Sequence, residues 1–91
     1  MNMCLFLGEI VKPVEVSQTK SGAPLCNLFV AVPDTIRVTA FDHTYSVASK
    51  LQVGDFVRIE ARVTQPIGHA YPRFTAFDIK VLDQTAVSRR A

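Results

Sequence analysis

Residues 35–63 read TIRVTAFDHTYSVASKLQVGDFVRIEARV, and this stretch decides the fold. Apolar residues alternate with polar ones along 35–41 and again along 56–63, a period of two that is typical of strands with one buried face. Between them, residues 42–54 lose this alternation. The letters DHT offer helix caps, VASKL carries apolar residues at helical spacing, and a glycine follows where helices commonly end. The stretch therefore predicts a strand, a short helix of about two turns and another strand.

The sequence before this stretch holds two further strand patterns. Residues 2–11 are mostly apolar, and Gly8 in their middle predicts a bulge or a sharp bend. Residues 14–18 continue the first strand as an extended edge, and the segment TKSGAP that follows has the composition of a turn. Residues 25–32 alternate again and end at a short turn of sequence PD. We therefore expect three strands before the helix.

The sequence after the stretch predicts one more strand. Residues 66–72 have the composition of a loop, and residues 74–82 that of a last strand. The order of three strands, one helix and two strands predicts an all-β, five-stranded Greek-key barrel of the OB type, with one short helix between strands three and four. An SH3-like barrel is the alternative, but it lacks a natural place for the helix. The residues expected on one face of the last strand are Thr75, Phe77, Ile79 and Val81.

Composition limits the class of protein. The chain has 91 residues, 48% of them hydrophobic and 20% charged, which suits one small folded domain. We expect that domain over residues 1–83 and a short disordered tail over 84–91. The absence of a membrane-length apolar run and of a signal-peptide pattern predicts a cytoplasmic protein. Cys4 and Cys26 are too few for a disulfide scaffold and are expected to be buried, reduced thiols.

Catalytic and metal-binding patterns are weak. His43 follows Asp42, but the sequence places no serine or cysteine with them as a nucleophile. The segment SGAP at 21–24 has neither the spacing of a phosphate-binding loop nor a helix after it. Two cysteines without CxxC spacing and two histidines make no zinc site. We therefore expect a protein that is not an enzyme and that needs no cofactor or metal.

Several segments resemble bacterial single-stranded DNA-binding proteins in the same order along the chain. SGAPLCNLFVAV at 21–32 resembles their second-strand signature, and LFLG at 5–8 resembles their first strand. VASKLQVGD at 47–55 is similar to their helix and following turn, and residues 73–82 look like their last strand. Each motif is short, but their collinearity spans residues 1–83.

The sequence also departs from that family pattern. The connection between the second and third strands is cut to Pro33-Asp34, and the chain has no tryptophan, which family members often use for stacking. It stops at SRRA, without the acidic tail that recruits replication and repair partners in cellular members of the family. In these respects it resembles the tail-less relatives, the primosomal replication protein PriB and the specialised plasmid and phage binders.

The resemblance implies sequence-tolerant binding of single-stranded DNA in replication or recombination. Such binding needs aromatic faces for bases and cations for phosphates. Alternation places Phe29, Arg37 and Phe41 on the face opposite the apolar residues of their strands, and the resemblance places Arg37 and Phe41 where the family contacts DNA. Thr35 falls where the family often has another aromatic, so one stacking position is missing. The candidate nucleic-acid-binding residues are Lys12, Lys20, Phe29, Arg37, Phe41, Arg58, Arg62, Tyr71, Arg73 and Phe74.

Alternative readings stay open for several of these residues and for the partner. Phe74 is also suited to closing the barrel, and Glu60 is placed to pair with Arg58 and Arg62. RNA is an alternative ligand, because the same platform accepts both nucleic acids. A PriB-like primosome adaptor whose OB face chiefly binds replication proteins is an alternative function. Residues 2–6 are a candidate for pairing with a second subunit, which predicts a homodimer or homotetramer.

Overall fold

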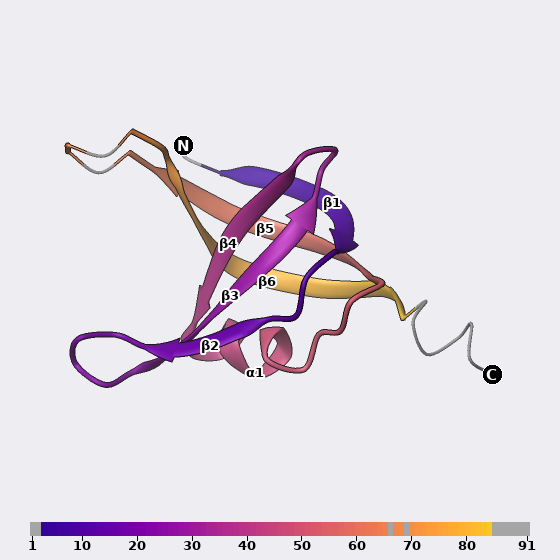
Figure 1. The fold of residues 1–91 in the computed structure, drawn as a ribbon, viewed down its shortest axis with the longest axis horizontal. Helices are drawn as coiled ribbons and strands as arrows, with labels where there is room; N and C mark the ends of the chain where they lie inside the picture. The colour runs from indigo at the N-terminus through magenta and orange to yellow at the C-terminus, as the bar shows by residue number, and fades with distance from the viewer. Residues whose placement is uncertain (1–2, 66, 69, 85–91) are drawn as a thin grey trace.

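The computed structural model describes residues 3–65, 67–68 and 70–84, and for residues 83–84 only the backbone. Within this part the chain forms six strands and one short helical segment (Figure 1). In chain order the elements are β1 (Cys4–Ile10), β2 (Glu15–Gln18), β3 (Pro24–Ala31), β4 (Thr35–Phe41), the 3-10 turn η1 (Asp42–Thr44), α1 (Tyr45–Ala48), β5 (Asp55–Thr64) and β6 (Arg73–Gln84).

Five of the strands close into a barrel. The strand order is β1-β5-β6-β4-β3-β2, and β1 also pairs with β3, which joins the two ends of the barrel (Figure 1). The closing contacts are Glu9 with Ala31 and Ile10 with Val30. β4 and β6 run parallel, whereas the other pairs are antiparallel. The predicted OB barrel is confirmed, and the predicted extended edge at 14–18 contains β2, which pairs with β3 outside the closed ring.

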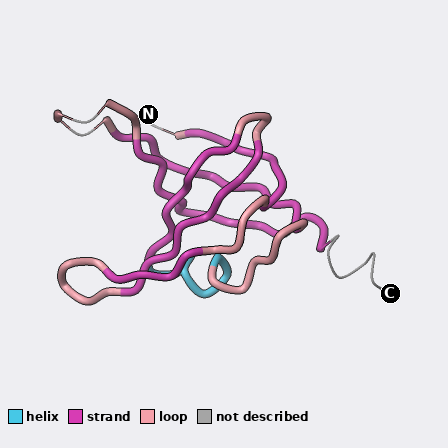
Figure 2. The backbone as a smooth tube through the Cα atoms, viewed as in Figure 1, coloured by secondary structure: helices cyan, strands magenta, loops and turns pink. Residues whose placement is uncertain are grey.

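The helical segment lies between β4 and β5, as predicted, below one end of the barrel (Figure 2). Ala48 and Leu51 are buried in the core. Thr44 is also buried, and its hydroxyl donates to the Phe41 carbonyl over 2.7 Å. Of the predicted cap residues, Thr44 is the N-cap of α1, whereas Asp42 and His43 cap neither turn; no side chain makes a capping hydrogen bond at either one. Gly54 does not cap the helix either: α1 ends at Ala48, and Gly54 lies in the turn before β5 with φ at 99°.

The core follows from the alternation along the strands. Leu28, Val38, Val57 and Ile59 are completely buried, as the pattern predicts for one face of each strand. Cys26 is buried among them, whereas Cys4 is only half-buried, so the expectation of two buried thiols holds for one of them. The buried apolar residues are Ile10, Cys26, Leu28, Val30, Val38, Ala40, Ala48, Leu51, Val57, Ile59, Ala61, Ala76 and Ile79.

The face predicted for the last strand is wrong, because β6 contains a bulge. Glu60 pairs with Asp78 but the next residue, Ala61, pairs with Ala76, so Phe77 is an extra residue in β6. Beyond an extra residue, the positions that would have faced the core face outward, and those that would have faced outward face the core. Ala76 and Ile79 are therefore both buried, although they are three positions apart in the sequence and regular alternation would place them on opposite faces. Phe77 itself lies beside exposed Arg62, on the outer surface.

Gly8 marks a close approach of two backbones. No bulge occurs there, because β1 and β5 stay in register on both sides of Gly8. A Cβ at Gly8 would overlap the carbonyl oxygen of Ala31 and lie 2.8 Å from a methyl carbon of Val30. Gly8 is the residue just before β1 begins to pair with β3, and β1 curves toward β3 at this end (Figure 1). The barrel therefore needs a residue without a side chain at this position.

Two further expectations concern membrane spans and the C-terminal tail. No helix in the described ranges is long and apolar enough to cross a membrane. The division into a domain over 1–83 and a tail over 84–91 stays a prediction, since residues 85–91 lie outside the described part. Gln84 is the last residue of β6.

Candidate functional site

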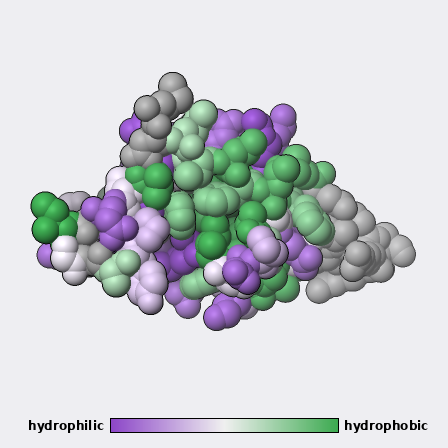
Figure 3. Space-filling view, turned by 90° about the horizontal axis from the view of Figure 1, so that it is seen from above, coloured by the Kyte–Doolittle hydropathy of each residue, from purple (hydrophilic) through white to green (hydrophobic). Residues whose placement is uncertain are grey.

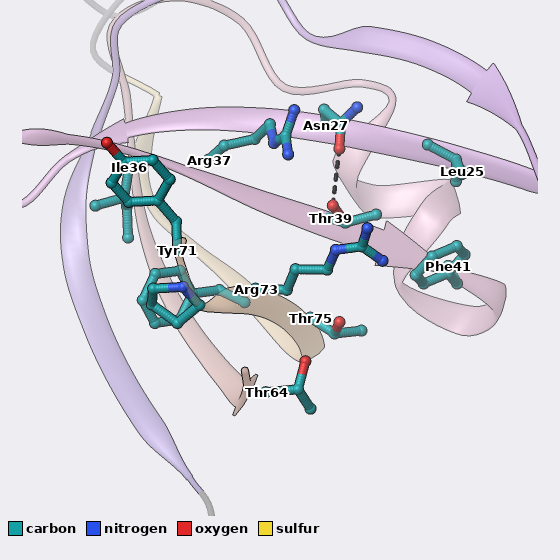
Figure 4. Close-up of a pocket in the computed structure, with 12 residues that line it drawn as sticks. Leu25, Asn27, Ile36, Arg37, Thr39, Phe41, Thr64, Tyr71, Arg73 and Thr75 are labelled. Carbon is teal, nitrogen blue, oxygen red and sulfur yellow. Dashed lines mark hydrogen bonds between the residues drawn. The ribbon is translucent and has the colours of Figure 1, made fainter. Parts of the chain in front are cut away.

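A groove of about 650 Å³ runs over the outer face of the barrel where β3, β4 and β6 lie side by side (Figure 4). The β2–β3 and β5–β6 hairpins project on the same side of the molecule, and both contribute to it (Figure 1). The groove is lined by Leu25, Asn27, Ile36, Arg37, Thr39, Phe41, Thr64, Tyr71, Pro72, Arg73, Phe74 and Thr75.

The strand register explains why β3 and β4 line this groove. Leu28 and Val38 point into the core and pair with each other, so their chain neighbours point outward. Asn27 then lies directly opposite Thr39. The neighbouring outward pairs are Leu25 with Phe41 on one side and Phe29 with Arg37 on the other. The predicted outward face of Phe29, Arg37 and Phe41 is confirmed.

β6 completes the groove through its parallel pairing with β4. Thr39 is in register with Thr75, and Val38 with Phe74, which places the start of β6 beside the middle of β4. Arg73, in register with Thr64 of β5, enters the groove from this side. Its guanidinium group lies below Thr39 and beside Phe41, while that of Arg37 lies beside Asn27 (Figure 4).

The groove is electrostatically positive. Arg37 and Arg73 are its charged lining residues, and no acidic side chain is among the described residues that line it. Among the described residues, an ion pair joins Arg58 to Glu60 over 3.0 Å, and neither Arg37 nor Arg73 takes part in it. Both guanidinium groups are exposed and available for an anion such as phosphate.

Three aromatic rings line the groove in different ways. Tyr71 is 80% exposed, and Phe41 is half-buried with its ring at the groove wall. Phe74 packs edge to face against Phe6, with ring centroids 5.1 Å apart, and both rings contact the core. Tyr71 and Phe41 therefore offer faces to a ligand, whereas the position of Phe74 favours closing the barrel.

Phe29 and Lys12 extend this surface beyond the groove. Phe29 is in register with Arg37, and the Lys12 ammonium lies 5.3 Å from the centre of the Phe29 ring. This distance is within the range of a cation–π contact. A ligand that leaves the groove past Arg37 would meet this pair next.

The remaining predicted cations lie elsewhere. Arg58 pairs with Glu60 on β5 and is in register with Leu7 of β1, away from the groove. Arg62 does not line the groove, but it borders it on β5, in register with Thr75, and its guanidinium carbon lies 5.8 Å from the centre of the Phe77 ring. Lys20 is exposed in the β2–β3 turn, whose ends are joined by a hydrogen bond from the Thr19 N–H to the Ala23 carbonyl (2.8 Å).

Sequence reasoning did not single out the polar centre of the groove. Asn27, Thr39 and Thr75 lie there, and the first two share the outward face of Phe29 and Phe41. The same alternation contained the signal, but neutral polar residues are common on any exposed face. Within the described residues, no three His, Cys, Asp or Glu side chains are grouped to hold a metal ion. Burial raises the pKa of the Cys26 thiol, which keeps it protonated and unreactive.

Solved structures of single-stranded DNA-binding proteins share this fold. The single-stranded DNA-binding protein of Thermus aquaticus matches with a TM-score of 0.78 and 20% identity over 92% of this chain and 41% of that one. The mitochondrial protein Rim1 of S. cerevisiae, also a single-stranded DNA-binding protein, matches with a TM-score of 0.79 and 14% identity over 90% and 94% of the two chains. Protein PriB from Ralstonia solanacearum gives 0.74 and 14% over 91% and 99%.

These likenesses show the fold, which is that of the OB domains in those proteins. The chain spans less than half the length of the Thermus aquaticus protein and nearly all of the other two. No protein-family model matches the sequence, and no curated protein does.

Proposed function

We propose that this chain binds single-stranded DNA along the groove formed by β3, β4 and β6. The observation that carries the proposal is one groove with two arginines and two accessible aromatic rings. Among the described residues, neither arginine has an ion-pair partner and none of the lining residues is acidic. Arg37 and Arg73 bind phosphates, and Tyr71 and Phe41 stack on bases. The structural likeness to single-stranded DNA-binding proteins supports the same ligand.

This chemistry selects single strands over duplexes. Base stacking on Tyr71 or Phe41 requires a base whose face is exposed, and a duplex hides its base faces between neighbouring pairs. Each stacked base contributes about 1–3 kcal/mol regardless of its identity. The arginines add an attraction that depends on salt, since bound phosphates release counterions. Binding of this kind tolerates any sequence and suits replication or recombination in the cytoplasm, at the nucleoid.

Titration of a labelled oligo-dT of roughly 35 nucleotides at low salt tests the proposal. We expect saturable binding that weakens as salt increases, and little binding to a duplex of the same length. Absence of binding to the single strand would overturn the proposal. A matched RNA oligomer in the same assay decides between the two nucleic acids, because tighter binding to RNA would make RNA the ligand.

A second copy of the chain is the partner that we propose for β1. Within the described residues, Cys4–Gly8 of β1 pair with β5 on one side only, so the other backbone edge is open for another strand. Leu5 and Leu7 are more than half exposed, and Met3 is too. Figure 3 looks down on the top of Figure 1, where β1 lies, and shows apolar residues gathered across this face.

Pairing through β1 would leave the groove open. The groove lies on β3, β4 and β6, whereas the open edge belongs to β1. Two copies joined there would present two grooves to one strand, and linked sites bind more tightly than either alone. Replication proteins, as in a PriB-like adaptor, are the alternative occupants of the same apolar face, and a monomer in sedimentation experiments would favour them.

A further inference from the structure

A row of outward side chains crosses the sheet from β4 over β6 to β5. Thr39 of β4 is in register with Thr75 of β6, and Thr75 is in register with Arg62 of β5. Thr75 lines the groove, and so does Thr64, which lies two residues from Arg62 on the same face of β5. Neighbouring strands are about 4.8 Å apart, so Arg62 stands one strand beyond the groove, directly at its border.

Phe77 is the aromatic residue beside Arg62. It is the extra residue of the β6 bulge and lies between buried Ala76 and exposed Asp78 in the sequence. The imidazole Nε2 of His43 lies 2.7 Å from the Phe77 carbonyl oxygen and donates to it, since a carbonyl only accepts. The guanidinium carbon of Arg62 lies 5.8 Å from the centre of the ring. The bulge thus brings a half-buried ring and an exposed cation together on the outer surface.

The charge of Arg62 is available to an anion. Glu60 lies two residues away on the same face of β5, but it pairs with Arg58 over 3.0 Å, and Arg62 has no ion-pair partner among the described residues. The contact of Arg62 with Phe77 is an exposed cation–π contact, which is weaker than a charge-assisted hydrogen bond to a phosphate. A phosphate would therefore draw the guanidinium group away from the ring and leave the face of the ring open.

We infer that Arg62 and Phe77 form a further nucleotide-binding position, reached by a strand that leaves the groove over Thr75. One phosphate binds the Arg62 guanidinium group, and one base stacks on the Phe77 ring. The inference rests on the proposed function, because it needs a strand of DNA in the groove. Lys12 and Phe29 form a similar pair of cation and ring beyond the β3 side of the groove. With both pairs, the binding surface crosses from β3 over β4 and β6 to β5.

Acidic side chains limit the binding surface beyond this position. Glu60 and Asp78 are in register with each other and follow Arg62 and Phe77 along β5 and β6. Their carboxylates repel phosphate, so the strand does not continue in that direction toward the next register pair, which includes Lys80. Lys80 is exposed on β6 and is separated from the groove by this acidic pair, which makes it a suitable control.

The test repeats the oligo-dT titration at a series of salt concentrations for the unaltered protein and for four variants. We expect Arg62→Ala to reduce the slope of log affinity against log salt by about 0.7, the value of one phosphate contact on a single strand. Phe77→Leu keeps an apolar side chain at the bulge but removes the aromatic face, and it should weaken binding by at least about fivefold. Phe77→Tyr keeps a ring and should retain most of the affinity.

Lys80→Ala is the matched control, since it removes an exposed cation and should leave both slope and affinity as they were. A slope for Arg62→Ala equal to that for Lys80→Ala overturns the inference. An unchanged affinity of Phe77→Leu overturns the stacking contact. If Phe77→Leu does not fold, as judged by thermal unfolding, Arg62→Ala decides alone. Failure of the unaltered protein to bind oligo-dT counts against the proposed function instead, and the two failures are thereby distinguished.

Discussion

Phe6 of β1 and Phe74 of β6 pack edge to face, with their ring planes at 87°. These two strands are not neighbours in the barrel, because β5 lies between them. The contact therefore joins side chains across β5 and fixes the start of β6. Arg73 precedes Phe74 directly, so this apolar contact also determines where one of the two groove arginines lies.

Replacing Phe6 by alanine is expected to destabilise the protein by about 2–3 kcal/mol, since a half-buried ring and its aromatic partner are lost. Urea unfolding measures the change. Val16→Ala, at an exposed apolar position on β2, is the control and should alter stability by less than about 0.5 kcal/mol. Equal stability of the two variants would show that the aromatic pair does not hold β6 in place.

Arg37→Ala and Arg73→Ala are each expected to make DNA binding less sensitive to salt. Removing one phosphate contact reduces the slope of log affinity against log salt by about 0.7 for a single strand. The measurement is a salt series of oligo-dT titrations. Lys50→Ala, which removes an exposed cation after α1, should leave the slope unchanged. A slope that falls equally in all three variants would mean that overall charge, and not the groove, governs binding.

Phe41→Ala is expected to weaken binding to oligo-dT by roughly 1–3 kcal/mol through loss of one stacking face. Phe41→Tyr keeps an aromatic ring at the same place and should retain most of the affinity. Both variants are titrated with the same oligomer after their folding has been checked by thermal unfolding. Equal affinity of Phe41→Ala and the unaltered protein would remove Phe41 from the binding surface.

Leu5→Lys combined with Leu7→Lys is expected to convert an oligomer into a monomer, since two charges on the exposed face of β1 oppose apolar contact with a second copy. Sedimentation velocity measures the change. Val16→Lys places a charge on an equally exposed apolar residue of β2 and should leave the assembly intact. A monomeric unaltered protein would contradict the proposed pairing.

The barrel and the outward face of two strands could be predicted from the sequence because a period of two reports burial directly. Leu28 and Val38 are apolar and buried, so their chain neighbours Phe29 and Arg37 are predicted to point outward. The same rule failed at Phe77, since a bulge depends on how β6 pairs with β5 and leaves no mark in a single strand.

The site was only partly predictable for a related reason. Arg37 and Arg73 are far apart in sequence, and their convergence depends on the parallel pairing of β4 with β6. Arg58 has the same alternation and charge, yet it lies on another side of the barrel beside Glu60. Alternation predicts Asn27 on the outward face of its strand, but its hydrogen bond with Thr39 depends on the register between β3 and β4.

The parallel seam between β4 and β6 has a consequence for folding. It consists of three register pairs, Val38 with Phe74, Thr39 with Thr75 and Ala40 with Ala76, whereas β5 and β6 pair along most of their length. A strand of nucleic acid in the groove would contact β4 and β6 at the same time. Any ligand that binds only the closed barrel stabilises it in proportion to the logarithm of its concentration. DNA bound across the seam would thus hold β4 and β6 together, and the free energy of unfolding of the barrel would be highest when the ligand is bound.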